Sequence, residues 1–90
     1  MKLLVRNKVN DFDAWLKVFK SHAPAHRAAG FHVEKVWRNI DDQREIFFIF
    51  EVEDRTKAEE FMATPLAADG AKEAGVIDGD HYFVVEFEDS

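Results

Sequence analysis

One stretch, residues 45–53, constrains the fold of this sequence more than any other. It reads Glu-Ile-Phe-Phe-Ile-Phe-Glu-Val-Glu and is rich in residue types that favour strands. Because alternate side chains of a strand point to opposite faces of its sheet, the stretch divides into two apolar sets. One face carries Ile46, Phe48, Phe50 and Val52, and the other carries Phe47 and Ile49. A strand that is apolar on both faces lies in the centre of its sheet, and both faces of that sheet need cover.

Three further strands are predicted around this stretch. Apolar and polar residues alternate over residues 2–9, 31–38 and 81–88, which is typical of strands. The polar run 39–44 predicts a hairpin loop, and the sequence Asp-Gly-Asp at residues 78–80 predicts a turn. The hairpin register that best matches charges and apolar faces pairs Arg38 with Glu45, Trp37 with Ile46, Val36 with Phe47 and Val33 with Phe50.

Two interrupted helices are predicted between the strands. Asn10 is the expected N-cap of the first, whose apolar residues recur at the i, i+3, i+4, i+7 spacing of an amphipathic helix. Pro24 should break this helix and Gly30 should end it, since proline removes a helical hydrogen bond and glycine favours a C-terminal stop. The second helix is expected to begin after Asp54 and to break at residues 64–65.

The resulting order, β-α-β-β-α-β, predicts an α+β fold, the ferredoxin-like sandwich. Right-handed crossovers then give an antiparallel sheet with strand order 4-1-3-2 and both helices on one face. Residues 1–90 are expected to form a single domain of this kind, because a chain of this length makes one small core.

The face opposite the helices is predicted to form a homodimer interface. The set expected beneath the helices is Val5, Val33, Trp37, Ile46, Phe48, Phe50, Phe83, Val85 and Phe87. The set expected on the opposite face is Leu4, Val36, Phe47, Ile49, Tyr82 and Val84. An apolar patch of this size is abnormal on a monomer, so we expect two sheets to pack face to face about a two-fold axis. The alternative is a monomer with a partly hydrated sheet.

Composition excludes several classes of function. The formal net charge of −6 argues against nucleic acid and gives no attraction to anionic membranes. The sequence has no Cys, which excludes disulfides, thiolate catalysis and Cys-based metal sites. No apolar run approaches the length of a membrane span, and residues 1–6 are too short and too soon charged for a signal peptide, so a cytoplasmic location is expected.

With this architecture, the chain resembles the dimeric α+β barrel superfamily, which includes antibiotic-biosynthesis monooxygenases, haem-degrading monooxygenases and small polyketide cyclases. The resemblance covers nearly the whole chain and is carried by residues 4–7, 11–15, 19–23, 27–30, 36–39, 41–42, 50–51, 61–62 and 74–76. It implies a small apolar or aromatic ligand and, for an enzyme, a monooxygenase or a cyclase/isomerase that needs no cofactor. Haem-degrading relatives carry an Asn on the first strand, which Asn7 matches by position, but no His of this sequence matches theirs.

A ligand site is predicted at one end of the sheet, beneath the second helix. Asn7 is polar on a strand face that is otherwise apolar, and the segment above it, around Gly70, is made mostly of small residues. Small residues over aromatic ones leave either close packing or a cavity. The predicted lining is Asn7, Trp15, Trp37 and Gly70, with His81 as a catalytic candidate. The alternative is that Asn7 is a satisfied structural amide and that both Trp residues belong to the core.

His22 is the second catalytic candidate, since an imidazole exchanges protons near neutral pH. The resemblance favours His22 over His26, because His22 belongs to the recurrent His-Ala pair after the first helix. The two stand four residues apart, but a metal site would need a third ligand such as His32 or Glu34, and Pro24 lies between them. We therefore predict no metal. A non-catalytic binding or assembly module remains the alternative to an enzyme.

Overall fold

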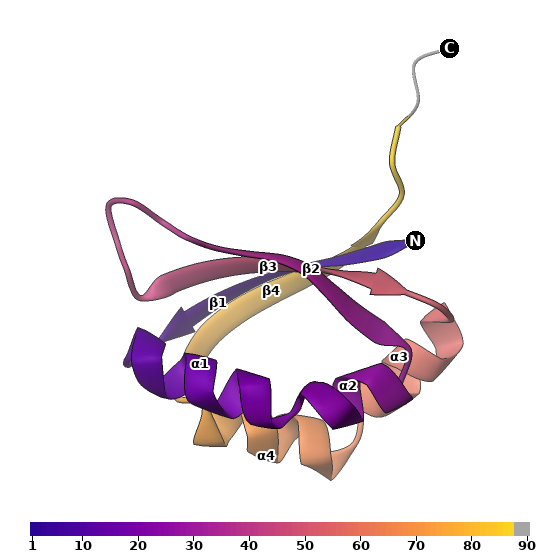
Figure 1. Cartoon of the computed structure of the whole chain (residues 1–90), viewed down its shortest axis with the longest axis horizontal. Helices are drawn as coiled ribbons and strands as arrows, with labels where there is room; N and C mark the ends of the chain where they lie inside the picture. Colours follow the sequence, from indigo (N-terminus) through magenta and orange to yellow (C-terminus); the bar gives the residue numbers. More distant parts are fainter. Residues whose placement is uncertain (88–90) are drawn as a thin grey trace.

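A computed structural model describes residues 1–87 of the chain. The elements are β1 (Lys2–Val9), α1 (Phe12–Ser21), α2 (Ala23–Ala28), β2 (Phe31–Arg38), β3 (Glu45–Val52), α3 (Arg55–Met62), α4 (Pro65–Glu73) and β4 (Val76–Val84). The strands form one antiparallel sheet in the order β2-β3-β1-β4, which is the predicted order read from the other edge. All four helices lie on one face of the sheet (Figure 1). The predicted α+β architecture, with the apolar strand β3 in a central position, is confirmed.

The helices begin at side-chain caps, one of which differs from the prediction. Asp11, not Asn10, is the N-cap of α1, and its carboxylate accepts a hydrogen bond from the backbone N–H of Ala14 at 3.1 Å. The backbone N–H of Asn10 instead donates to the carbonyl of Gly75, so this residue belongs to the junction between β1 and β4. Asp54 caps α3 as predicted.

Glycine and proline divide the helical segments as the sequence indicates. α1 ends at Ser21 and α2 begins at Ala23, so Pro24 occupies the first turn of a new helix, where its missing N–H is no loss. Gly30 follows α2 with a φ of 85°, a conformation that residues with a Cβ rarely adopt. The chain can therefore reverse there and enter β2.

The hairpin register differs from the prediction beyond Val33. Val33 does face Phe50, but a bulge then places one extra residue in β2 before Lys35 pairs with Ile49. Because the side-chain period of a strand is two, one extra residue exchanges the two faces for everything that follows. The actual pairs are Val36 with Phe48, Trp37 with Phe47 and Arg38 with Ile46.

The bulge therefore reverses three face assignments. Trp37 lies on the outer face of the sheet, where it is 46% exposed, and Val36 lies on the helix face. Arg38 also lies on the helix face, with its guanidinium 3.9 Å from the ring centroid of Phe12. Its predicted partner, Glu45, accepts hydrogen bonds from Asn39 and Arg6 instead, and these lower the pKa of Glu45.

Strand β4 begins five residues before the predicted start at His81, and residues 78–80 are part of it rather than a turn. Asp78, Gly79 and Asp80 pair with Lys8, Asn7 and Arg6 of β1. Aspartate and glycine are poor strand formers, but the Arg6 guanidinium donates to Asp78 at 2.9 Å and to Asp80 at 3.0 Å. These ion pairs favour the extended conformation that the composition alone does not.

At its other end, β4 stops at Val84, so two residues predicted beneath the helices lie beyond the sheet. Val85 is 79% exposed and Phe87 is 88% exposed. Glu88, the predicted end of the strand, lies outside the described residues.

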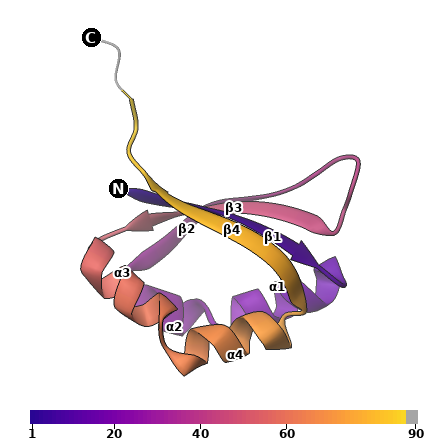
Figure 2. The ribbon, with the colours of Figure 1, turned by 180° about the vertical axis from the view of Figure 1, so that it is seen from behind.

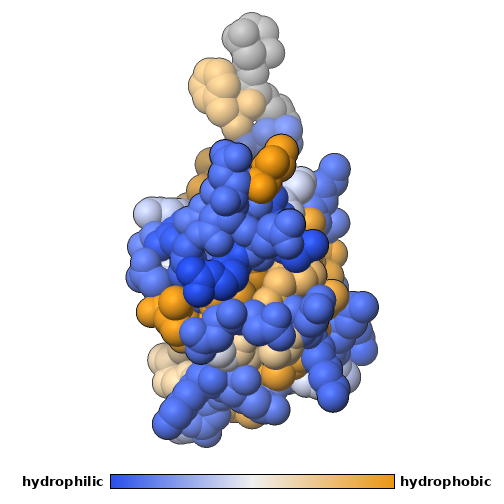
Figure 3. Space-filling model, turned by 90° about the vertical axis from the view of Figure 1, so that its left-hand side faces the viewer, coloured by the Kyte–Doolittle hydropathy of each residue, from blue (hydrophilic) through white to orange (hydrophobic). Residues whose placement is uncertain are grey.

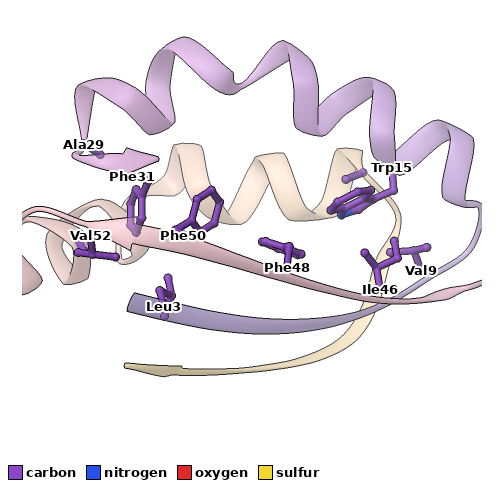
Figure 4. Close-up of a cluster of buried hydrophobic side chains, with 11 residues drawn as sticks. Leu3, Val9, Trp15, Ala29, Phe31, Ile46, Phe48, Phe50 and Val52 are labelled. Atoms are coloured by element: carbon purple, nitrogen blue, oxygen red, sulfur yellow. The ribbon is translucent and has the colours of Figure 1, made fainter. Parts of the chain in front are cut away.

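The core lies between the helix layer and the sheet. Figure 4 shows Trp15 of α1 above Phe48, Ile46 and Val9, with Phe31, Phe50 and Val52 towards the other end. The buried residues are Leu3, Val9, Trp15, Ala29, Phe31, Ile46, Phe48, Phe50, Val52, Ala58 and Ala74. The Trp15 ring stacks on Phe19 at 4.7 Å and meets Phe48 at 5.5 Å between centroids. Such aromatic pairs add about 0.5–1.5 kcal/mol each beyond simple burial.

The outer face of the sheet has no cover within residues 1–87 (Figure 2). Strand pairing places Leu4, Trp37, Phe47, Ile49, Tyr82 and Val84 on it. Ion pairs border this apolar face: Arg6 with Glu45, Asp78 and Asp80, Lys2 with Glu34, and Lys8 with Asp42. Among residues 1–87, no helix combines the length and apolar character needed to cross a membrane.

Candidate functional site

A cavity of about 160 Å³ lies between the sheet and the helix layer. Its lining comes from β1, β3, the start of β4 and all four helical segments. The residues are Asn7, Trp15, Val18, Phe19, His22, His26, Phe48, Phe50, Phe61, Ala67, Gly70, Ala71, Ala74 and Val76. Most of these side chains are apolar. The polar groups that reach this space are one amide, one indole and two imidazoles.

Asn7 supplies the amide from the centre of the sheet. It stands between Ile46 of β3 and Gly79 of β4. A Cβ at Gly79 would lie 2.9 Å from Asn7 Oδ1, so the glycine leaves the space that the amide occupies. Within residues 1–87 the amide forms no hydrogen bond, and none of its polar atoms is fully enclosed. Its donor and acceptor are therefore available to whatever enters the cavity.

Trp15 forms the wall beneath α1. Only 2% of the residue is exposed, because its ring packs against the rings of Phe12, Phe19 and Phe48. The apolar stripe of α1 that the sequence reveals explains this position. Its rigid ring gives the cavity a flat aromatic surface.

His22 lies at the junction of α1 and α2 and faces α4. The ideal Cβ position on Gly70 is 3.0 Å from His22 Cε1 and 3.3 Å from Nδ1. A side chain at residue 70 would therefore push the imidazole aside by a few tenths of an ångström. His22 Nε2 is 3.9 Å from Glu73 Oε2, and that carboxylate is largely exposed.

His26 stands one helical turn further on and is surrounded by aromatic rings. Its ring centroid is 5.5 Å from those of both Phe19 and Phe50, and 6.1 Å from that of Phe61. Burial lowers the pKa of His26, and the charge of His22 lowers it further. A neutral imidazole, able to accept a proton, is thus favoured at this position. The i, i+4 spacing of the two histidines is the sequence signal that places both here.

Two of the predicted site residues lie elsewhere. Trp37 is on the outer face, because of the bulge in β2. His81 is in the middle of β4, opposite Val5, because that strand begins at Val76 rather than near His81. It lines an open recess beside Arg55 instead. The cavity thus brings together Asn7, Trp15, Gly70 and His22 of the predicted set, together with His26, which the sequence reasoning ranked below His22.

The third metal ligands considered from the sequence do not join the two histidines. His32 pairs with Glu53, and Glu34 pairs with Lys2 at the border of the outer face. Among residues 1–87, no group of three His, Asp or Glu side chains has the arrangement of a metal site.

The arrangement suits a flat apolar molecule that carries one or two polar substituents. Apolar walls with a few convergent polar groups are the usual composition of a small-ligand site. The Asn7 amide can donate or accept a hydrogen bond, and a neutral His26 can accept a proton.

Comparison with solved structures identifies the same fold in several proteins. One is an antibiotic biosynthesis monooxygenase that is 16% identical, with 97% of this chain and 98% of that chain covered at a TM-score of 0.71. SnoaB from Streptomyces nogalater, a cofactor-independent oxygenase, is 20% identical, with coverages of 97% and 93% and a TM-score of 0.72. A NIPSNAP domain protein from Burkholderia xenovorans is 12% identical, with coverages of 97% and 95% and a TM-score of 0.65.

No protein-family model matches this sequence, and neither does any curated protein. The likeness is therefore one of three-dimensional structure, and at these identities it establishes the fold rather than the activity. By that fold, the chain is similar to the dimeric α+β barrel proteins of the antibiotic-biosynthesis-monooxygenase type.

Proposed function

We propose that the protein is a homodimer that binds a small aromatic or polyketide-like molecule between sheet and helices and acts on it without a cofactor. The reaction would be an oxygenation or a cyclisation/isomerisation. The observation that carries this proposal is the Asn7 amide, which faces an apolar cavity without a hydrogen-bond partner among residues 1–87. The amide is not fully enclosed and has no partner among these residues, so its donor and acceptor are open to a polar substituent of a ligand in the cavity.

The remaining lining residues suggest how such chemistry would proceed. A neutral His26 would accept a proton from a phenolic or enolic hydroxyl, with His22 as a second acceptor. Asn7 would donate a hydrogen bond to the negative oxygen that results. Trp15 would hold the aromatic ring in place. The electron-rich anion would then react with dioxygen, or close a ring, through positioning and a few hydrogen bonds. The fold shared with SnoaB supports this class of reaction.

The uncovered outer face supports the dimer. Phe47 and Ile49 at its centre are apolar and only partly buried, and Trp37 and Tyr82 extend the patch towards both edges. Each large apolar side chain that becomes buried contributes about 1.5–3 kcal/mol. The ion pairs that surround the patch, such as Arg6 with Asp78, would form its polar rim.

Replacing Asn7 with leucine, which has a similar shape, tests the ligand role. A hydrogen-bonded structural amide would lose stability when replaced, but an amide without a protein partner would not, because no hydrogen bond within the subunit is lost. We expect the free energy of unfolding to stay within about 1 kcal/mol of the original or to rise, and the affinity for 2-naphthol to fall about 3–10-fold. Naphthol binding is followed by quenching of Trp15 fluorescence in a Trp37→Phe background.

Asn39→Ala is the matched control. The Asn39 amide donates to Glu45 at 2.9 Å and its oxygen accepts from the backbone of Asp41, far from the cavity lining. This variant should lose stability and keep its naphthol affinity. Equal losses of affinity and stability in Asn7→Leu would reduce Asn7 to a packing role. Oxygen uptake with anthrone or 2-naphthol tests catalysis. If the original chain takes up oxygen no faster than His26→Gln does, the result favours a non-catalytic binding module.

A further inference from the structure

The chain leaves the sheet as a short arm that contacts little of its own subunit. Residues 85–87, the C-terminal arm, follow β4 without regular structure, and Val85 and Phe87 are among the most exposed apolar residues described. Figure 1 shows the arm extending away from the body, and Figure 3 shows apolar atoms at its end, next to the grey residues. Its sequence alternates apolar and acidic residues, Val-Glu-Phe, and continues with Glu and Asp.

A groove of complementary character lies at the opposite edge of the sheet. The β2 groove runs between β2 and helices α1 and α2 and encloses about 460 Å³. Its lining residues are Leu16, Phe19, Lys20, Ala23, His26, Arg27, Phe31, His32, Val33, Val36 and Phe50. The floor is apolar, and Val33 remains 51% exposed. Lys20 and Arg27 give the groove basic groups, His32 already pairs with Glu53, and no lining residue is acidic.

The β2 groove and the ligand cavity share a wall. Phe19, His26 and Phe50 line both spaces, so the His26 ring stands in the partition between them. β2 is an edge strand, and within residues 1–87 no element pairs with its free edge or covers the groove. A segment laid in this groove would therefore close the outer side of the cavity wall and shield His26 from water.

The arm leaves its own subunit in a direction away from the β2 groove. β4 and β2 are the two edges of the sheet, with β1 and β3 between them, so about 14 Å of sheet separates them. The arm also points away from the helix layer in both views of the ribbon (Figures 1 and 2). A second copy of the chain can supply the arm, and the acidic arm matches the basic groups of the groove.

We infer that the C-terminal arm of each copy docks in the β2 groove of the other copy and closes the ligand cavity next to His26. This inference rests on the proposed dimer and the proposed ligand site. It makes each site a product of both subunits, because one subunit supplies the cavity and the other supplies the cover of its wall. The alternation of the arm places Val85 and Phe87 on one side, towards the apolar floor, and Glu86 on the other, towards the basic rim.

Cysteine pairs test the docking directly, because the chain has no cysteine of its own. The variant Val33→Cys/Phe87→Cys should form a covalent dimer on mild oxidation, seen on a non-reducing gel. The control pair Ile77→Cys/Phe87→Cys, with residue 77 exposed on β4, should form far less. An oxidised monomer would show that the arm folds back onto its own groove. Equal crosslinking of both pairs would show an arm without a fixed site. Either result overturns the inference.

Truncation after Val84 tests the functional part. Loss of two apolar side chains from each of the two arms, offset in part by the cost of ordering the arms, should raise the dimer dissociation constant by about 100-fold or more and weaken 2-naphthol binding, while far-UV circular dichroism stays unchanged. A charge reversal supplies a control that keeps the arm: Arg27→Glu should weaken the dimer, and Glu86→Lys in the same chain should restore it. Unchanged dimerisation and naphthol affinity after truncation would refute the role of the arm. An untruncated chain that is monomeric or binds no naphthol would instead refute the proposed function.

Discussion

Gly70→Ala is the substitution whose outcome depends most closely on the geometry of the cavity. Gly70 is the sixth residue of the nine-residue helix α4, a position where glycine has no conformational advantage. The added methyl group would lie 3.0 Å from His22 Cε1 and 3.3 Å from His22 Nδ1. The imidazole must therefore move by a few tenths of an ångström. It has the freedom to do so, since its nearest ionic partner, Glu73, is 3.9 Å away and the cavity lies beside it.

The magnitude follows from three terms. Alanine in place of glycine inside a helix contributes about 0.5–1 kcal/mol. A methyl group buried in apolar surroundings adds about 0.8 kcal/mol. A displaced or off-rotamer His22 costs about 0.5–1.5 kcal/mol. The net expectation is a free energy of unfolding that changes by between about −0.2 and +1.3 kcal/mol, centred on a rise of about 0.5 kcal/mol. The affinity for 2-naphthol should fall about 10-fold, because the methyl group and the displaced ring occupy ligand space.

Urea denaturation and naphthol titration measure the two quantities on the same preparations. Ala68→Gly, on the exposed side of the same helix, is the control, and it should lose about 0.5–1 kcal/mol of stability with no change in affinity. A loss of more than about 1 kcal/mol in Gly70→Ala would show that His22 is locked in place. An unchanged naphthol affinity would show that ligands do not lie against Gly70.

Two further expectations concern the sheet faces and the titration of His26. Phe47→Asp should give a folded monomer by light scattering, whereas Phe48→Asp should unfold the subunit, since Phe48 is buried and a charge there has no partner. A dimeric Phe47→Asp variant would contradict the proposed interface. Burial and the charge of His22 lower the pKa of His26, so the unfolded chain binds the extra proton first as pH falls below about 6.5. The free energy of unfolding should thus decrease from pH 7.5 to 5.5, and it should decrease less in His26→Gln. An equal decrease in both proteins would contradict a lowered pKa of His26.

The sequence predicts the elements of this fold well because the local signals agree with the tertiary structure. The two apolar faces of residues 45–53 fix the central position of β3, and Gly30 and Pro24 divide the helices as their backbone chemistry requires. Asn7 and Gly70 could be placed at one site because strand order and helix order determine which ends meet. These inferences use patterns that span several residues and do not depend on the position of any single one.

The incorrect predictions concern strand register and element boundaries, which depend on single residues. Nothing in the composition of residues 31–38 indicates the extra residue near Val33, since bulges arise from pairing between strands. The early start of β4 depends on ion pairs between Arg6 and the two aspartates, which no local propensity reveals. Both errors moved site residues: the first removed Trp37 from the cavity, and the second removed His81.

The bulge in β2 also has a consequence for how this chain tolerates length changes. Deleting Glu34, the extra residue, would give an unbroken ladder that keeps the present pairs from Lys35 onwards. Trp37 would stay beside Phe47 on the outer face, and Arg38 would stay at the ring of Phe12. A one-residue gap at this point in an alignment would thus mark the loss of a bulge, with the inner and outer side chains of the strand unchanged.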